Sequence, residues 1–114
     1  MSLEEKHCIP CEGKIDPMSR DEEDQLLEKV DGWKIQRDGT HKIRKGFEFK
    51  DFKQAMRFVN EVAEIAEHEG HHPDIYIYYN KVELTLYTHA VGGLFSNDFV
   101  MAAKINAIPL VKTG

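Results

Sequence analysis

Residues 67–89 read EHEGHHPDIYIYYNKVELTLYTH, and this stretch sets the order of elements in the second half of the chain. Apolar and polar residues alternate over residues 74–79 and again over 82–87, which predicts a β-hairpin with one buried face. The turn should lie at Asn80-Lys81, because asparagine tolerates a positive φ. A sheet built from this hairpin is the centre of the expected fold.

Three helices are predicted, each by its own start signal. Capping boxes at residues 19–22 (Ser-Arg-Asp-Glu) and 51–54 (Asp-Phe-Lys-Gln) begin the first two helices. The second helix is strongly amphipathic and should end at about residue 68, because Gly70 interrupts it. Ser96 or Asn97 is suited to cap the last helix.

A second hairpin is predicted earlier in the chain. Asp38-Gly39 is a strong hairpin signal, and it separates two candidate strands over residues 33–37 and 41–49. Gly46 suggests a bulge or bend in the second of these strands. Together the elements predict an α+β domain in the order α-β-β-α-β-β-α. We expect a four-stranded antiparallel sheet with the helices packed on one face, and an opposite face that meets water or a partner.

Length and composition restrict the class of protein. The 114 residues are enough for one domain, which we expect over residues 19–114, preceded by an N-terminal arm over residues 1–18. The net charge of −5 argues against a nucleic-acid binder, which needs a basic face. No apolar run approaches the length of a membrane span, and the first residues lack the apolar region of a signal peptide. We therefore expect a cytoplasmic protein.

Cys8 and Cys11 form a C-x-x-C pair, and they are the chain's only cysteines. A structural zinc site of this type needs a second pair of ligands, and His7 adds only one. A thioredoxin-like redox centre would place the motif between a strand and a helix, whereas this pair lies in the arm. An incidental or subunit-bridging role is the favoured interpretation.

The histidines of the quoted stretch match a zinc-protease pattern. His68-Glu69-Gly70-His71-His72 has the form H-E-x-x-H, in which both outer histidines must lie on one face of a continuous helix. Gly70 weakens the helix, and Pro73 moves the residue before it toward an extended backbone. We therefore expect His68 and His72 to diverge, and the match to be coincidental.

Two other interpretations of the histidines stay open on the residues alone. Histidines at a helix end often complement the last backbone carbonyls, which would suit His68. Acid–base catalysis would instead use His71 and His72 at the helix-to-strand turn together with His89 after the hairpin. His89 should project away from the core if the strand continues to it.

Several separated motifs of the chain resemble those of the pterin-4a-carbinolamine dehydratase family. They occur in the same order and at similar spacing. The resemblance covers nearly all of the chain after the arm. Its motifs are Gly32-Trp33, Phe47-x-Phe49-x-Asp51-Phe52, Glu67-x-x-x-His71-His72-Pro73, Tyr79-Asn80-Lys81-Val82, Thr88-His89, Gly93-Leu94 and Asp98.

The resemblance implies an activity and a role for each site residue. Members of the family dehydrate 4a-hydroxytetrahydrobiopterin, left when aromatic amino-acid hydroxylases use their pterin cofactor, to quinonoid dihydropterin. His71 and His89 then look like the acids that protonate the leaving hydroxyl, and His72 like a pterin-binding acid–base partner. Glu67 and Asp98 look like supporting carboxylates. The resemblance implies no metal or other cofactor, and a homodimer or homotetramer.

The same resemblance carries alternatives and two departures. Some animal members also bind a transcription factor and stabilise its dimer. For dehydratase-like proteins in organisms without an aromatic amino-acid hydroxylase, the resemblance leaves open a role in another pterin pathway, such as molybdenum cofactor metabolism. Gly70 stands where some members carry an acidic residue. Phe95 stands where a small hydroxyl residue is common, which would reshape the rim of the pocket. Neither departure removes a proposed catalytic group.

Overall fold

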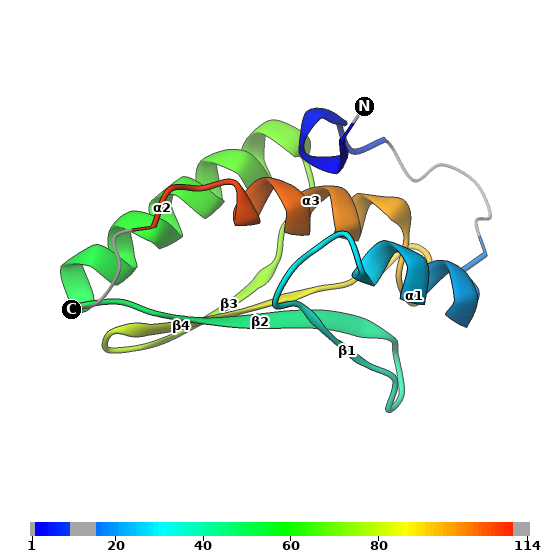
Figure 1. Ribbon diagram of the computed structural model, residues 1–114, viewed down its shortest axis with the longest axis horizontal. Coiled ribbons are helices and arrows are strands. Elements are labelled where there is room, and N and C mark those ends of the chain that lie inside the picture. The colour runs from blue at the N-terminus through cyan, green and yellow to red at the C-terminus, as the bar shows by residue number, and fades with distance from the viewer. Residues whose placement is uncertain (1, 10–15, 111–114) are drawn as a thin grey trace.

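The computed structural model describes residues 2–9 and 16–110, which form a helical layer over an antiparallel sheet (Figure 1). The predicted α-β-β-α-β-β-α order is confirmed within these residues, and a short 3₁₀ turn, η1, precedes it. The elements are η1 (Leu3–Glu5), α1 (Arg20–Leu27), β1 (Lys34–Gln36), β2 (Lys42–Glu48), α2 (Phe52–Glu69), β3 (Asp74–Tyr78), β4 (Lys81–Leu86) and α3 (Ser96–Asn106). Cys11 lies outside the described residues.

The sheet has the strand order β1-β2-β4-β3, and every neighbouring pair is antiparallel. The central pair aligns Ile43 with Leu86 and Phe47 with Val82, so their side chains share the buried face. The bulge predicted at Gly46 is wrong, because Gly46 pairs with Glu83 in an unbroken register. Glycine is accommodated there simply as an exposed residue of a regular strand.

Lys45 breaks the apolar pattern of β2 because its ammonium reaches polar groups at the edge of the core. Its Nζ donates to the backbone oxygen of Asp31 at 3.0 Å and to Oδ1 of Asn106 at 2.9 Å. The same Asn106 oxygen accepts the indole N–H of Trp33 at 3.0 Å. Burial lowers the pKa of Lys45, and the nearby Asp31 carboxylate opposes that shift. The aliphatic stem of the lysine therefore stays inside while its charge is hydrogen-bonded.

Helices α2 and α3 cover one face of the sheet, and the core lies between the two layers (Figure 1). The ring of Phe58 on α2 packs at a tilt against the rings of Phe47 and Phe49, with centroids 4.5 and 5.1 Å away. Burying each large side chain contributes about 1.5–3 kcal/mol, so these contacts fasten α2 to the sheet. The first half of α2 is thereby held over the strands.

The helix ends follow the predicted signals in part. Ser19 and Glu22 form the complete capping box, and Asp51 accepts the backbone N–H of Gln54 at 2.9 Å. The reciprocal half of the second box is absent, since the buried Gln54 Oε1 finds no partner among the described residues. Helix α2 ends at Gly70, whose φ of 67° is left-handed.

The cap predicted for the last helix is wrong. The N-cap of α3 is Phe95, and its backbone N–H is satisfied from inside the helix by the Asp98 carboxylate at 3.0 Å. Ser96 is the first helical residue, and the Asn97 side chain is bonded to the backbone of Ile9. Asp98 thereby places a carboxylate in the first turn of the helix, where the helix dipole favours negative charge.

The second hairpin turns one residue earlier than predicted. Tyr79 has the positive φ, at 52°, whereas Asn80 was expected to have it. Asn80 is instead held against the end of β2, because it exchanges backbone and side-chain hydrogen bonds with Phe49, each of 2.8 Å. Those bonds fix Asn80, and the left-handed backbone conformation is adopted by Tyr79 instead.

The face of the sheet opposite the helices is exposed in this chain. Tyr76 and Tyr78 on the edge strand β3 lie there, beside Arg44 and Glu83 of the central strands. The expectation of a face left for water or a partner fits this arrangement. Among the described helices, none has both the length and the apolarity that crossing a membrane requires.

Candidate active site

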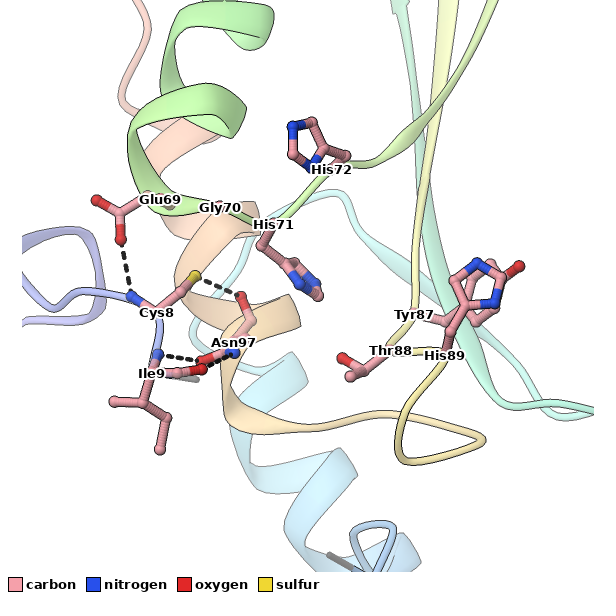
Figure 2. A pocket seen from close by; sticks show the side chains of 10 residues that line it. All are labelled: Cys8, Ile9, Glu69, Gly70, His71, His72, Tyr87, Thr88, His89 and Asn97. Carbon is pink, nitrogen blue, oxygen red and sulfur yellow. Dashed lines mark hydrogen bonds between the residues drawn. The ribbon is translucent and has the colours of Figure 1, made fainter. Parts of the chain in front are cut away.

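A cavity of about 540 Å³ lies where the end of α2, the segment after β4, the start of α3 and the N-terminal residues meet (Figure 2). Three of the predicted site residues line it, His71, His72 and His89. The other lining residues are Cys8, Ile9, Glu69, Gly70, Tyr87, Thr88 and Asn97. Segments from both ends of the chain therefore build one site.

His71 is the most firmly held of the three histidines. Its side chain is only 13% exposed, and its Nε2 lies 2.6 Å from Oδ1 of the fully buried Asp98. A carboxylate only accepts hydrogen bonds, so Nε2 is the ring nitrogen that donates in this contact, and Nδ1 is the ring nitrogen that Asp98 does not contact. The backbone N–H of His71 donates to Ala66 at 3.2 Å, which anchors the residue to the last turn of α2.

Asp98 is held by three donors from three segments. Besides His71, its Oδ2 accepts the Thr88 hydroxyl at 2.8 Å and the backbone N–H of Phe95 at 3.0 Å. A buried carboxylate would be costly without such partners. The network joins the end of α2, the segment after β4 and the start of α3, and so fixes the orientation of the His71 ring.

His72 lies in a different environment although it is the next residue. Its side chain is 60% exposed, and its Nε2 lies 3.6 Å from a carboxylate oxygen of Glu67, which is 80% exposed. Glu67 does not line the cavity. His72 and Glu67, which were predicted separately as site residues, therefore lie close together, but at the solvent edge of the site.

His89 lies beyond the end of β4 and approaches the cavity from the sheet side. Its ring packs at a tilt against Tyr87, with centroids 4.4 Å apart, and the Lys42 ammonium lies 4.5 Å from the centre of the Tyr87 ring. Figure 2 shows His89 across the cavity from His71, with Thr88 between them. The site thus presents imidazoles from two sides.

Glu69 is a site residue that the sequence interpretation missed. Its side chain is 3% exposed, and its Oε1 accepts the backbone N–H of Cys8 at 2.7 Å. Burial acts to raise the pKa of Glu69, but hydrogen bonds from His7 and Cys8 and the charge of Lys104 hold that pKa below its usual range. No sequence signal pointed to this contact, because its partners lie about sixty residues upstream.

The N-terminal residues are fastened to the site by Asn97. Its Oδ1 accepts the backbone N–H of Ile9 at 2.9 Å, and its Nδ2 donates to the Ile9 carbonyl at 2.8 Å. The Cys8 thiol donates to the backbone oxygen of Asn97 at 3.6 Å (Figure 2). Cys8 is therefore part of the cavity wall, a position that its C-x-x-C motif did not indicate.

The predicted divergence of His68 and His72 is confirmed. His72 lines the cavity described above, whereas His68 lines a different one. Among the described residues, the donor atoms close enough to hold one ion with His68 come from His7 and Glu69, and His72 is not in that group. The left-handed backbone at Gly70 separates them.

Comparison with known proteins identifies the family. The model of a family described as "Pterin 4 alpha carbinolamine dehydratase" matches residues 16–108. The chain belongs to this family. A relative from Nitrosospira multiformis, provisionally named a pterin-4-alpha-carbinolamine dehydratase, is 48% identical over 93% of this chain and 91% of its own length. Pterin-4-alpha-carbinolamine dehydratase 2, mitochondrial, of Arabidopsis thaliana is 42% identical over 93% of this chain and 58% of its own length.

Two solved structures have similar folds. The crystal structure of a transcriptional coactivator/pterin dehydratase from Brucella melitensis has a TM-score of 0.76 and 39% identity, covering 82% of this chain and 98% of that one. A pterin dehydratase-like protein described as a RuBisCO assembly factor in the alpha-carboxysome has a TM-score of 0.57 and 27% identity, covering 67% and 87%. The predicted α+β fold and the predicted family are both confirmed.

Proposed function

We propose that this protein dehydrates 4a-hydroxytetrahydrobiopterin to quinonoid dihydropterin in the recycling of tetrahydrobiopterin. The observation that carries the proposal is the grouping of His71, His72 and His89 around one cavity, with His71 held by a buried carboxylate. Membership of the family supports the same reaction. The exposed sheet face would suit a homodimer or homotetramer, and we propose that the reaction needs no cofactor.

The reaction requires that one proton is delivered to the 4a-hydroxyl and that another is removed from the neighbouring ring nitrogen. The 4a-hydroxyl is a poor leaving group until it is protonated, after which the carbon–oxygen bond breaks and water departs. The neighbouring ring nitrogen then loses its proton, and the electron pair of that N–H bond forms the new carbon–nitrogen double bond. Imidazoles exchange protons near neutral pH, so histidines suit both steps.

We assign these tasks to the residues from their contacts and positions in the cavity. Asp98 fixes His71 through Nε2 and stabilises the imidazolium form, so Nδ1 serves as the acid toward the hydroxyl. His89, on the opposite side, is a second acid for a hydroxyl on the other face of the pterin. The more exposed His72, with Glu67 beside it, would bind the pterin and accept the ring proton.

Alanine substitutions at His71 and His89, singly and together, test this assignment. Each single variant should lose activity toward one configuration of the substrate, and the double variant should lose about 100-fold or more, the range of general acid–base catalysis. The matched control is His41→Gln, which is outside the cavity and retains a donor for Glu23, its partner at 2.8 Å. Unchanged turnover in the double variant would refute the assignment.

A binding role without turnover is the second candidate. One similar structure is described as a coactivator as well as a pterin dehydratase, and another as a dehydratase-like assembly factor. In that case the cavity would bind a pterin or a protein partner while the wild-type chain showed no rate above the uncatalysed reaction. The same assay therefore separates the two candidates.

A further inference from the structure

A second group of side chains lies on the other side of the α2 end, beside η1. His7, His68 and Glu69 each offer one donor atom there, and the three atoms lie within 4.8 Å of one another. The shared Oε2 of Glu69 lies 2.9 Å from Nδ1 of His7 and 3.9 Å from Nε2 of His68. They line a cavity of about 540 Å³ that none of His71, His72 and His89 lines.

We propose that His7, His68 and Glu69 form a site for a divalent transition-metal ion of the zinc class, which fastens the N-terminal strap, residues 2–9, to the end of α2. Imidazole nitrogen and carboxylate oxygen are established zinc ligands. Bond lengths of about 2.0–2.2 Å at tetrahedral angles place ligand atoms about 3.4 Å apart. The observed 2.9 and 3.9 Å bracket that spacing, so rotation of two exposed imidazoles completes the geometry.

The carboxylate is already oriented for this role. Its other oxygen, Oε1, accepts the backbone N–H of Cys8 at 2.7 Å, which leaves Oε2 directed toward the imidazoles. Such an outer contact is what usually orients a metal-binding carboxylate. The His7 and His68 side chains are 70% and 76% exposed, so an ion can enter from solvent and keep a water as its fourth ligand.

One positive group opposes the ion. The Lys104 ammonium lies 3.8 Å from the same Glu69 oxygen and donates to the Glu4 carbonyl at 2.8 Å. Its charge repels a divalent cation at this oxygen, so removing it should tighten binding. Replacing Lys104 should therefore strengthen metal binding, whereas replacing a ligand should weaken it.

The site has a consequence for the neighbouring cavity. His7 directly precedes Cys8 and Ile9, which line the candidate active site. An ion at His7 would hold this part of the strap in place and restrict its movement away from that cavity. The strap also lies outside the residues that match the family model, which begin at residue 16. His68 and Glu69 lie inside that match, but the test of the site measures metal binding and not turnover, so it is independent of the proposed dehydration.

Titration of the chelator-treated full chain with Co²⁺, followed by displacement with Zn²⁺, tests the site. The wild type should develop the visible absorption of tetrahedral Co²⁺ and a raised Tm with Zn²⁺. His7→Ala and His68→Ala should each weaken binding at least about tenfold, the smallest effect expected even of outer-shell changes. Lys104→Gln should strengthen it, and circular dichroism should show that all variants remain folded.

Variants of the other cavity locate the ion. His72→Ala and His89→Ala should bind Co²⁺ as the wild type does, because neither residue belongs to the strap site. Absence of tetrahedral Co²⁺ binding in the wild type would overturn the proposal. Affinity that is unchanged in both His7→Ala and His68→Ala, or lost only in His72→Ala or His89→Ala, would overturn it as well.

Discussion

His71 and His72 are neighbours in sequence, yet their side chains differ in exposure and in the carboxylate that each contacts. The His71 side chain is 13% exposed and 2.6 Å from a buried carboxylate, whereas the His72 side chain is 60% exposed and 3.6 Å from an exposed one. Pro73, the next residue, leads the chain into β3. The fold thus holds the His71 ring in place, whereas the His72 ring remains exposed, and under the proposed function the substrate would position it.

The difference shows how a helix end can present two kinds of group in one site. A group fixed by a buried network loses little entropy when it reacts, so it suits proton transfer at a defined atom. An exposed group adapts to a bound ring. Substitutions that act on one member of the pair, and not on the other, test this division.

Asp98→Asn should have the largest effect. The amide keeps the size of the carboxylate but can donate to His71, which would favour the wrong ring tautomer and remove the charge that stabilises the imidazolium. We expect kcat to fall about 100-fold or more with little change in KM. Steady-state kinetics on a folded variant measure the split, and a kcat within a few-fold of wild type would contradict it.

Gly70→Ala should reduce stability next most strongly. Gly70 has a left-handed backbone at φ 67°, where a side chain costs about 1–2 kcal/mol. The displaced turn should disturb His71 and His72 together. Gly46→Ala is the control, because a Cβ there meets nothing within 4 Å and the backbone is regular strand. Equal denaturation midpoints for the two variants would contradict the account.

Thr88→Val should have an intermediate effect. The substitution keeps the shape of the side chain and removes the hydroxyl that donates to Asp98 at 2.8 Å. Asp98 keeps its bonds to His71 and to the backbone of Phe95, so losing this one donor should cost about 0.5–1.5 kcal/mol of unfolding free energy and lower kcat several-fold. Urea unfolding together with kinetics measures both, and a variant as stable and active as wild type would show that the network does not need this bond.

Glu67→Gln should have the smallest effect, and it is the direct counterpart of Asp98→Asn. Exposed ion pairs contribute little, so stability should change by less than about 0.5 kcal/mol. Any kinetic change should appear in KM, since Glu67 reaches the site only through the exposed His72. A loss of kcat comparable to that of Asp98→Asn would break the comparison between the two histidines.

Local signals predicted most of the fold. The capping box at Ser19, the glycine at the end of α2 and the two hairpins are confirmed, because periodicity and end signals act within a few residues of each other. The errors arose where a distant contact decided the local structure. Asn80 does not adopt the left-handed backbone conformation, because it bonds to Phe49. Asn97 does not cap α3, because it bonds to Ile9.

The same difference between local signals and distant contacts decides which features of the candidate site could be predicted. Spacing and resemblance identified the three cavity histidines, and the structure brings His71 together with Asp98. The buried contact of Glu69 with the backbone of Cys8 could not be predicted, because no periodic pattern connects residues 61 positions apart. The depth at which Asp98 lies, and its bond to Thr88, likewise depend on how α3 packs against the sheet.

The most direct test of the central claim is the rate at which the chelator-treated wild-type chain dehydrates chemically prepared 4a-hydroxytetrahydropterin, followed by absorbance. We expect rapid turnover that needs no added metal and that is lost when His71 and His72 are both replaced by alanine. A rate no greater than the uncatalysed reaction, or a rate that the double variant retains, would contradict it.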